Sequence, residues 1–214
     1  MRQFQVDGFA VVAGVCVSSG SSSWYHDANG SDEAAGGIGI EVGFAFAVAG
    51  AKGVLFADIN HEGAARAADR SKSLASNPRY KALSAALDVT DPNSVRAMAD
   101  LAASEFGRID YFTNAVGVGM KEFVPFEHTR DEDYDRLLAV NAKGAFLLSK
   151  AVISIMQMQE PLLVDLGRHG VRDVGRGAIV NVCSAMSLGA VPAKASYVAS
   201  KHAMLGLTRA AGGQ

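Results

Sequence analysis

The sequence is poor in cysteine, in net charge and in long apolar runs, and each shortage argues against a class of protein. Its 214 residues contain two cysteines, Cys16 and Cys183, and no export signal is recognised, so we expect a reducing, cytoplasmic setting rather than a disulfide-stabilised scaffold. A formal net charge of -2 gives no electrostatic basis for binding nucleic acid. No apolar run approaches about 18 residues, so we expect no membrane span and no membrane partner.

Histidine is also scarce, and its spacing does not suit a metal. None of the five histidines has a second histidine four residues away or a paired cysteine; they stand at positions 26, 61, 128, 169 and 202. Metal sites in proteins usually show such spacings. We therefore predict no metal site.

What the chain does have is an alternation of short apolar runs with helical patterns. Strands are predicted at 9–13, 53–58, 80–87, 109–113 and 177–182. Helices are predicted at 40–49, 61–75, 92–107 and 132–158, with a last one ending near 212, while 160–176 is a polar excursion. This alternation predicts an α/β fold, a doubly wound parallel sheet in a three-layer sandwich, in one domain over residues 1–214.

One stretch near the end combines a phenol with an ammonium. Of the five tyrosines, Tyr197 alone has a lysine, Lys201, four residues later, on the same face of a helix. A free tyrosine has a pKa of about 10, so it works as an acid or base near neutral pH only where its phenolate is stabilised. A nearby lysine does this. Chance supplies such a pair in roughly one sequence of five, so the pair needs partners, and Ser184 follows the preceding strand.

A second pattern lies at the first strand. With residues 15–33 removed, Gly14 joins a run ending in Gly37, Ile38 and Gly39, which gives Gly-x-x-x-Gly-x-Gly between a strand and a helix. Glycines there let the backbone approach a pyrophosphate. Asp58 ends the second strand 19 residues after Gly39, where a carboxylate accepts hydrogen bonds from an adenosine ribose and repels a 2′-phosphate. We therefore expect NAD rather than NADP.

In order and spacing these motifs resemble the classical short-chain dehydrogenase/reductase family, whose fold is the Rossmann fold. The resemblance rests on Gly14 with Gly37-Ile38-Gly39, on Asp88-Val89, on Asn114-Ala-Val-Gly117, and on Asn141, Ser184 and Tyr197-x-x-x-Lys201. The sequence departs from the family at Ala13, where threonine is usual, and at Ala115-Val116.

The resemblance implies a role for each of these residues. Gly14, Gly37, Ile38, Gly39, Asp58, Asp88, Val89, Asn114 and Gly117 would bind the cofactor. Tyr197 would be the general acid or base, and Lys201 would stabilise it and hold the nicotinamide ribose. Ser184 would bind the substrate oxygen and Asn141 would anchor a water in the proton relay. The substrate would be a secondary alcohol or ketone, and full-length members form dimers or tetramers.

Two departures leave a second interpretation open. Residues 15–33 interrupt the glycine loop, and we interpret them as a retained intron of 57 nucleotides or, alternatively, as a genuine atypical loop. A codon 33 that does not end in AG excludes the intron. The family also continues past this helix with two strands and a segment covering the substrate, so the sheet is predicted to be incomplete at its C-terminal edge. The chain is then either an NAD-dependent oxidoreductase or an inactive fragment, at most a nucleotide-binding or interaction module.

Overall fold

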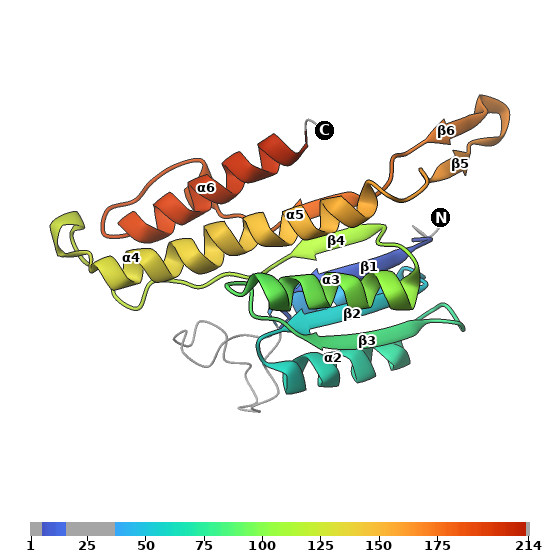
Figure 1. The fold of residues 1–214 in the computed structure, drawn as a ribbon, viewed down its shortest axis with the longest axis horizontal. Coiled ribbons are helices and arrows are strands. Elements are labelled where there is room, and N and C mark those ends of the chain that lie inside the picture. Colours follow the sequence, from blue (N-terminus) through green and yellow to red (C-terminus); the bar gives the residue numbers. More distant parts are fainter. Residues whose placement is uncertain (1–5, 16–36, 213–214) are drawn as a thin grey trace.

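The structure is a computed structural model, and it describes residues 6–15 and 37–212. Its centre is a parallel five-stranded sheet with the strand order β3-β2-β1-β4-β7 (Figure 1). The strands are β1 (Phe9–Ala13), β2 (Gly53–Asp58), β3 (Lys81–Ala86), β4 (Tyr111–Asn114) and β7 (Ala178–Asn181). The order reverses between β1 and β4, as in a doubly wound sheet. The predicted fold class is confirmed.

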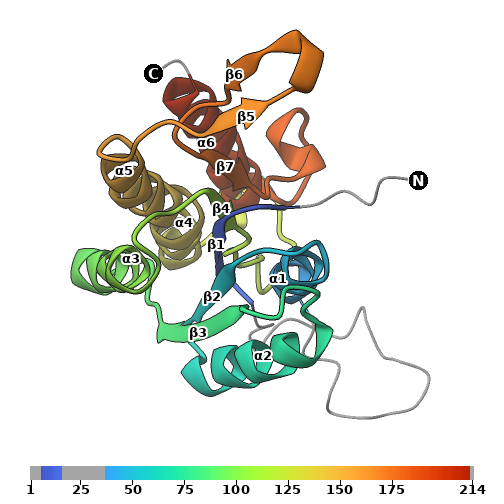
Figure 2. The same cartoon turned by 90° about the vertical axis from the view of Figure 1, so that its right-hand side faces the viewer.

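Helices cover the two faces of the sheet and make two separate cores. Along β1 the side chains alternate, so Ala10 and Val12 pack with α1 (Ile38–Val48) and α2 (His61–Leu74). Val11 and Ala13 face the other way, towards α3 (Pro92–Phe106) and α5 (Ala145–Met156). All six residues of β2 are buried, as expected for a strand covered on both faces. Figure 2 shows these layers end-on.

Several helix ends lie where their capping residues predict. The Asn60 side chain accepts the N–H of Gly63 at the start of α2, and Asp91 accepts the N–H of Asn93 at the start of α3, before Pro92. Gly107 ends α3 in the left-handed conformation, with φ of 76°. Each of these caps depends on residues within a few positions of the helix end, so the sequence alone is sufficient to predict where the helix begins or ends.

The predicted helix 132–158 is a continuous helix that changes type in its middle. It consists of α4 (Asp131–Leu137), a π-helical segment η2 (Leu138–Gly144) and α5. At its end Gly144 packs so closely on Val89 that a Cβ there would lie 2.7 Å from the Val89 side chain. The π-helical segment, which contains Asn141, was not predicted. Such single-turn segments are frequent at functional sites.

The same helix bears on the expected absence of a membrane span. Within the described residues, Asp131–Met156 is long and apolar enough to cross a bilayer by length and composition. Core helices of water-soluble proteins pass this test as well, and its segments η2 and α5 pack against α6 (Ala195–Ala211) and α3. The absence of a membrane partner stays a prediction.

The structure corrects the sequence reading at two further places. β4 begins at Tyr111 rather than Ile109, because the Gln159 side chain bonds both the N–H and the carbonyl of Ile109. The polar excursion 160–176 contains an exposed antiparallel hairpin that projects from the body (Figure 1). It is made of β5 (Leu163–Asp165), the turn η3 (Gly167–His169) and β6 (Val171–Asp173).

Two predictions remain: an incomplete sheet at its C-terminal edge, and an insertion at residues 15–33. β7 is an edge strand of the sheet among the residues described, and the Val180 side chain on it is 56% exposed. The predicted insertion at 15–33 lies outside the described residues except for Val15, which is buried.

Candidate active site

The turn after β1 and the start of α1 are built from close backbone contacts that only glycine permits. Gly14 has a φ of 82°, and a Cβ on it would lie 2.5 Å from the backbone nitrogen of Val116, in the loop after β4. A Cβ on Gly39 would overlap the carbonyl oxygen of Gly14. Gly37 precedes α1, whose N-terminus has no side-chain cap, and Ile38 begins the helix with its side chain 65% exposed. We call this glycine turn the cradle, and glycine turns at helix N-termini bind pyrophosphate groups in many proteins.

Beside this cradle, one pocket is lined by residues from the ends of four strands. Gly14, Asp58, Asp88, Val89 and Gly117 all line it. Asp58 is buried, with 7% of its surface exposed, and its side chain accepts the N–H of Asn60 at 2.9 Å. That of Asp88 accepts both the N–H and the hydroxyl of Thr90. The structure therefore brings five of the predicted cofactor residues together, as the parallel topology requires.

Asn114 lies beneath this pocket rather than in its lining. It is fully buried, its side-chain oxygen accepts the N–H of Val116 at 3.1 Å, and its amide nitrogen donates to Asn181 on β7 at 3.1 Å. Asn181 in turn donates to Thr208 on α6 at 3.0 Å. Asn114 thus shapes the loop after β4 and ties it to the neighbouring strand.

The Lys201 ammonium lies where the pocket meets α6. Lys201 is 5% exposed, and its Nζ donates to the carbonyl of Val182 at 3.3 Å. Burial lowers the pKa of Lys201 from its ordinary value of 10.5, and a negative charge on Cys183 acts in the opposite direction. The Nζ is 5.8 Å from the centre of the Tyr197 ring. A Cβ on Gly117 would lie 3.3 Å from it, so the lysine borders the pocket.

Asn141 sits in the π-helical segment with its amide fully enclosed by protein. Its Oδ1 accepts the N–H of Val118 at 2.8 Å, and its Nδ2 donates to the Val118 carbonyl and to the Ser200 hydroxyl, both at 3.0 Å. Both amide hydrogens are thereby used. Ser200 was missed by sequence reasoning. Its one available signal was a hydroxyl between Tyr197 and Lys201 on the same helix.

Ser184 and Tyr197 are both half-buried. Ser184 caps the short 3₁₀ helix η4 (Ala185–Ser187), where its hydroxyl oxygen accepts the N–H of Met186 at 3.2 Å. The hydroxyl hydrogen stays available for another acceptor, such as a substrate oxygen. Lys143 and Lys150 are exposed on the long helix, so they lie outside this group of buried and half-buried side chains.

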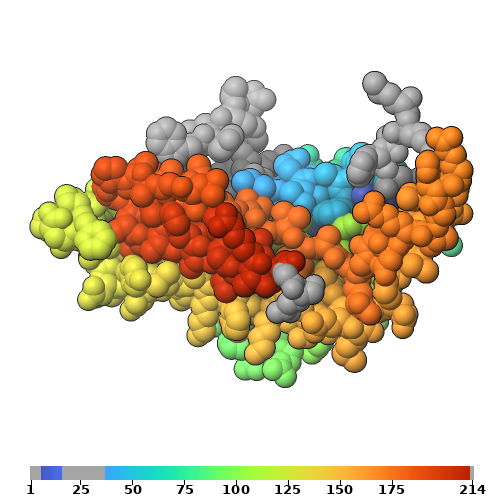
Figure 3. All heavy atoms as spheres, turned by 90° about the horizontal axis from the view of Figure 1, so that it is seen from above, coloured from blue at the N-terminus to red at the C-terminus, as the bar shows by residue number. Residues whose placement is uncertain are grey.

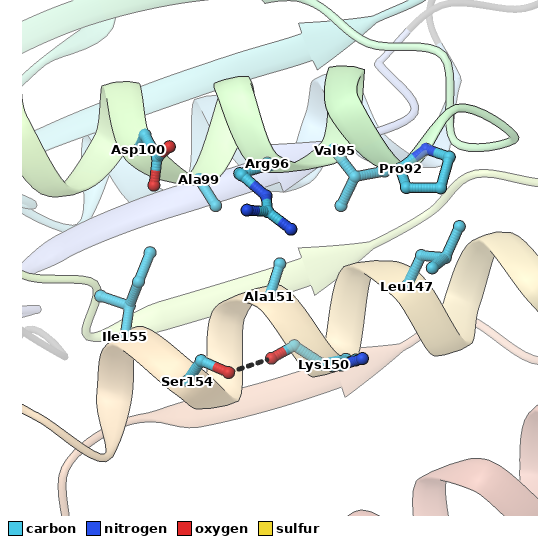
Figure 4. A pocket seen from close by; sticks show the side chains of 10 residues that line it. All are labelled: Pro92, Val95, Arg96, Ala99, Asp100, Leu147, Lys150, Ala151, Ser154 and Ile155. Carbon is cyan, nitrogen blue, oxygen red and sulfur yellow. Dashed lines mark hydrogen bonds between the residues drawn. The ribbon is translucent and has the colours of Figure 1, made fainter.

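A second groove in the molecule lacks the predicted functional residues. It lies between α3 and α5, where Val95, Ala99 and Ala151 face one another and the charged groups are Arg96, Asp100 and Lys150 (Figure 4). None of the predicted site residues lines it. The convergence of functional side chains, rather than the size of a hollow, singles out the pocket at the strand ends.

Comparison with known proteins agrees with this geometry. The profile described as short chain dehydrogenase matches residues 33–214. Short-chain dehydrogenase anuF of Penicillium roqueforti is 40% identical over 179 residues, and srdC of Neurospora crassa is 37% identical over 175. The crystal structure of a short chain dehydrogenase from Mycobacterium smegmatis superimposes with a TM-score of 0.73 at 22% identity, which shows the common fold. The chain belongs to the short-chain dehydrogenase family.

The matched lengths are unequal. The match to anuF covers 83% of this chain but 64% of that protein, and the match to srdC covers 82% and 64%. The structural match covers 98% of this chain and 71% of the other. The chain thus spans about 64% of the length of these curated relatives. Family membership implies a nicotinamide cofactor, NAD or NADP.

Proposed function

We propose that this chain carries the centre of an NAD(H)-dependent oxidoreductase that acts on a secondary alcohol or ketone. One observation supports this proposal most strongly. Gly117 lines the pocket that holds the predicted cofactor residues, and it also lies against the Lys201 ammonium, next to Tyr197. The cofactor side and the chemical side of the site therefore meet at one residue.

The proposed reaction transfers a hydride and a proton to different acceptors. In the oxidation, the hydrogen on the alcohol carbon leaves as a hydride, for which bound NAD supplies the acceptor. Tyr197 accepts the hydroxyl proton as general base, and in the reduction of a ketone it returns that proton as general acid. The Ser184 hydroxyl donates a hydrogen bond to the substrate oxygen. The buried Lys201 ammonium, 5.8 Å from the centre of the Tyr197 ring, would stabilise negative charge on the phenol oxygen.

Asp58 supports NAD over NADP. Its carboxylate lies in the pocket lining at the end of β2, 7% exposed. A carboxylate at this position accepts hydrogen bonds from ribose hydroxyls, and it would repel the additional phosphate of NADP.

An inactive nucleotide-binding module is the second candidate. It is favoured by the lining of the cofactor pocket, to which Ser184, Tyr197 and Lys201 do not contribute. This candidate therefore predicts binding without turnover.

Replacing Tyr197 by Phe separates the two candidates. An oxidoreductase loses turnover of a panel of secondary alcohols with NAD by about a hundredfold or more, the scale of general acid–base catalysis. It keeps its affinity for NADH, because the phenyl ring stays. Turnover that is equal in wild type and Tyr197→Phe contradicts the assignment of Tyr197. Binding of NADH without any turnover by the wild-type chain supports the module.

A further inference from the structure

Ser200 lies between Tyr197 and Lys201, the two catalytic candidates of α6. Its side chain is fully buried. Its hydroxyl donates to the carbonyl of Tyr197 at 2.9 Å and accepts from Nδ2 of Asn141 at 3.0 Å. A hydroxyl has one hydrogen, so the bond to Tyr197 fixes its direction and leaves a lone pair towards Asn141.

The amide of Asn141 is oriented by these partners. The Val118 N–H requires the amide oxygen and the Val118 carbonyl requires the amide nitrogen, so the amide is held on one side by the backbone of the loop after β4. The second hydrogen of Nδ2 goes to Ser200. Without Ser200, this hydrogen would be buried without the partner that holds it here, since Asn141 is 0% exposed.

The chain of contacts continues into the cofactor pocket. Val118 follows Gly117, where a Cβ would lie 3.3 Å from the Lys201 Nζ and 3.5 Å from Asn141 Oδ1. Val116, on the other side of Gly117, touches the turn at Gly14. In Figure 3 the chain that follows β4 (yellow-green) reaches the same end of the molecule as the start of α6 (orange-red).

We propose that Ser200 is a positioning residue that acts through Asn141 to tie the cofactor-side loop Gly117–Val118 to the helix bearing Tyr197 and Lys201. Its effect on catalysis rests on the function proposed above, whereas its effect on the loop does not. The loop and the helix would then keep one relative position, which sets the place of the Lys201 ammonium beside the cofactor.

A purely structural role is the alternative, because a buried serine that bonds a carbonyl three residues earlier is common in helices. The chain offers a matched control for it. Ser71 on α2 is also fully buried and donates to the carbonyl of Ala68, also three residues earlier. Its second partner is the hydroxyl of Tyr80, and neither lines the cofactor pocket.

Amide hydrogen exchange on the full chain tests the proposal without any need for turnover. In Ser200→Ala we expect the Val118 amide to exchange about tenfold faster or more, because the amide that accepts its N–H loses an anchor. Ser200→Cys keeps the size but offers a weak acceptor, so it should show the same effect if Ser200→Ala does not fold. Ser71→Ala should leave Val118 unchanged, and Ser200→Thr should restore protection.

The outcomes are distinct. The proposal is overturned if the Val118 amide exchanges at the wild-type rate in whichever of Ser200→Ala and Ser200→Cys folds. It is also overturned if Ser71→Ala accelerates the exchange of this amide as much as the Ser200 variant does. A titration with NADH measures the effect on cofactor binding. We expect the dissociation constant to rise about tenfold in Ser200→Ala and to stay at the wild-type value in Ser71→Ala. If the wild-type chain itself binds no NADH, the proposed function fails, while the exchange measurement still decides the role of Ser200.

Discussion

The Lys201 ammonium lies next to Gly117 although 84 positions separate the two residues in the chain, and it limits the room for a larger side chain at residue 117. A Cβ at residue 117 would be 3.3 Å from Nζ and 3.5 Å from Oδ1 of Asn141. This distance is tight for a Cβ but the lysine end is flexible, so the expected cost is a displacement of a few tenths of an ångström rather than a lost fold.

Gly117→Ala should therefore weaken NADH binding more than it weakens the fold. We expect about a threefold to tenfold rise in the dissociation constant, since a displaced ammonium loses part of a charge-assisted contact. The free energy of unfolding should change by less than about 1 kcal/mol. Isothermal titration and denaturant unfolding measure the two quantities.

Gly119→Ala is the control for this substitution, because a Cβ there meets no atom of the described residues within 4 Å. It should bind NADH as the wild type does, and the smaller entropy of its unfolded chain should leave its stability equal or slightly higher. If both variants lose the same affinity, the contact between Gly117 and Lys201 has no special role.

Lys201→Met should stabilise the chain near neutral pH while it abolishes turnover. Burial lowers the pKa of Lys201, so between that lowered value and 10.5 the unfolded chain binds more protons than the folded one. Stability of the wild type then rises with pH across this window, and the penalty for burying the charge is complete below it. The advantage of Lys201→Met should accordingly shrink as the pH approaches 10.5.

Urea unfolding at several pH values from 7 to 10 measures this difference. Lys143→Met, at an exposed lysine of the long helix, is the control: it keeps Lys201, so its stability should rise with pH as that of the wild type does. A Lys201→Met variant that is less stable than the wild type at pH 7 contradicts the prediction.

Asp58→Asn should shift the preference from NADH towards NADPH while the variant still binds a cofactor. The neutral amide removes the repulsion of a 2′-phosphate and keeps hydrogen-bonding groups at the end of β2. We expect the ratio of NADPH to NADH dissociation constants to fall by about tenfold, or roughly 1.4 kcal/mol. Fluorescence titration with each cofactor gives the ratio. A wild-type chain that binds NADPH more tightly would show that Asp58 does not select NAD.

Much of this arrangement was accessible from the sequence, because it depends on local rules. The apolar runs gave β1 and β2, and Asn60, Asp91 and Gly107 marked helix ends through their own caps. Parallel topology then required that the residues following the strands meet at one edge. The predicted neighbours in the pocket follow from that requirement.

What the sequence did not reveal depends on tertiary contacts. The π-helical turn around Asn141 has no distinct sequence signal, and its amide is fixed by Val118 and Ser200, which come from distant segments. Ser200 looked like any small helix residue. Similarly, β4 starts late because Gln159, 50 residues away, binds the backbone of Ile109. Such partners are visible only once the chain is folded.

A nicotinamide site that binds its cofactor should raise the melting temperature of this chain, and thermal unfolding with and without NADH measures that rise. If the dissociation constant is near 10 µM, 1 mM NADH adds about 2.7 kcal/mol of stability, and the melting temperature should rise by about 5–10 °C for a chain of this length. Adenosine should give a much smaller rise. An unchanged melting temperature at millimolar NADH would show that this chain has no nicotinamide site.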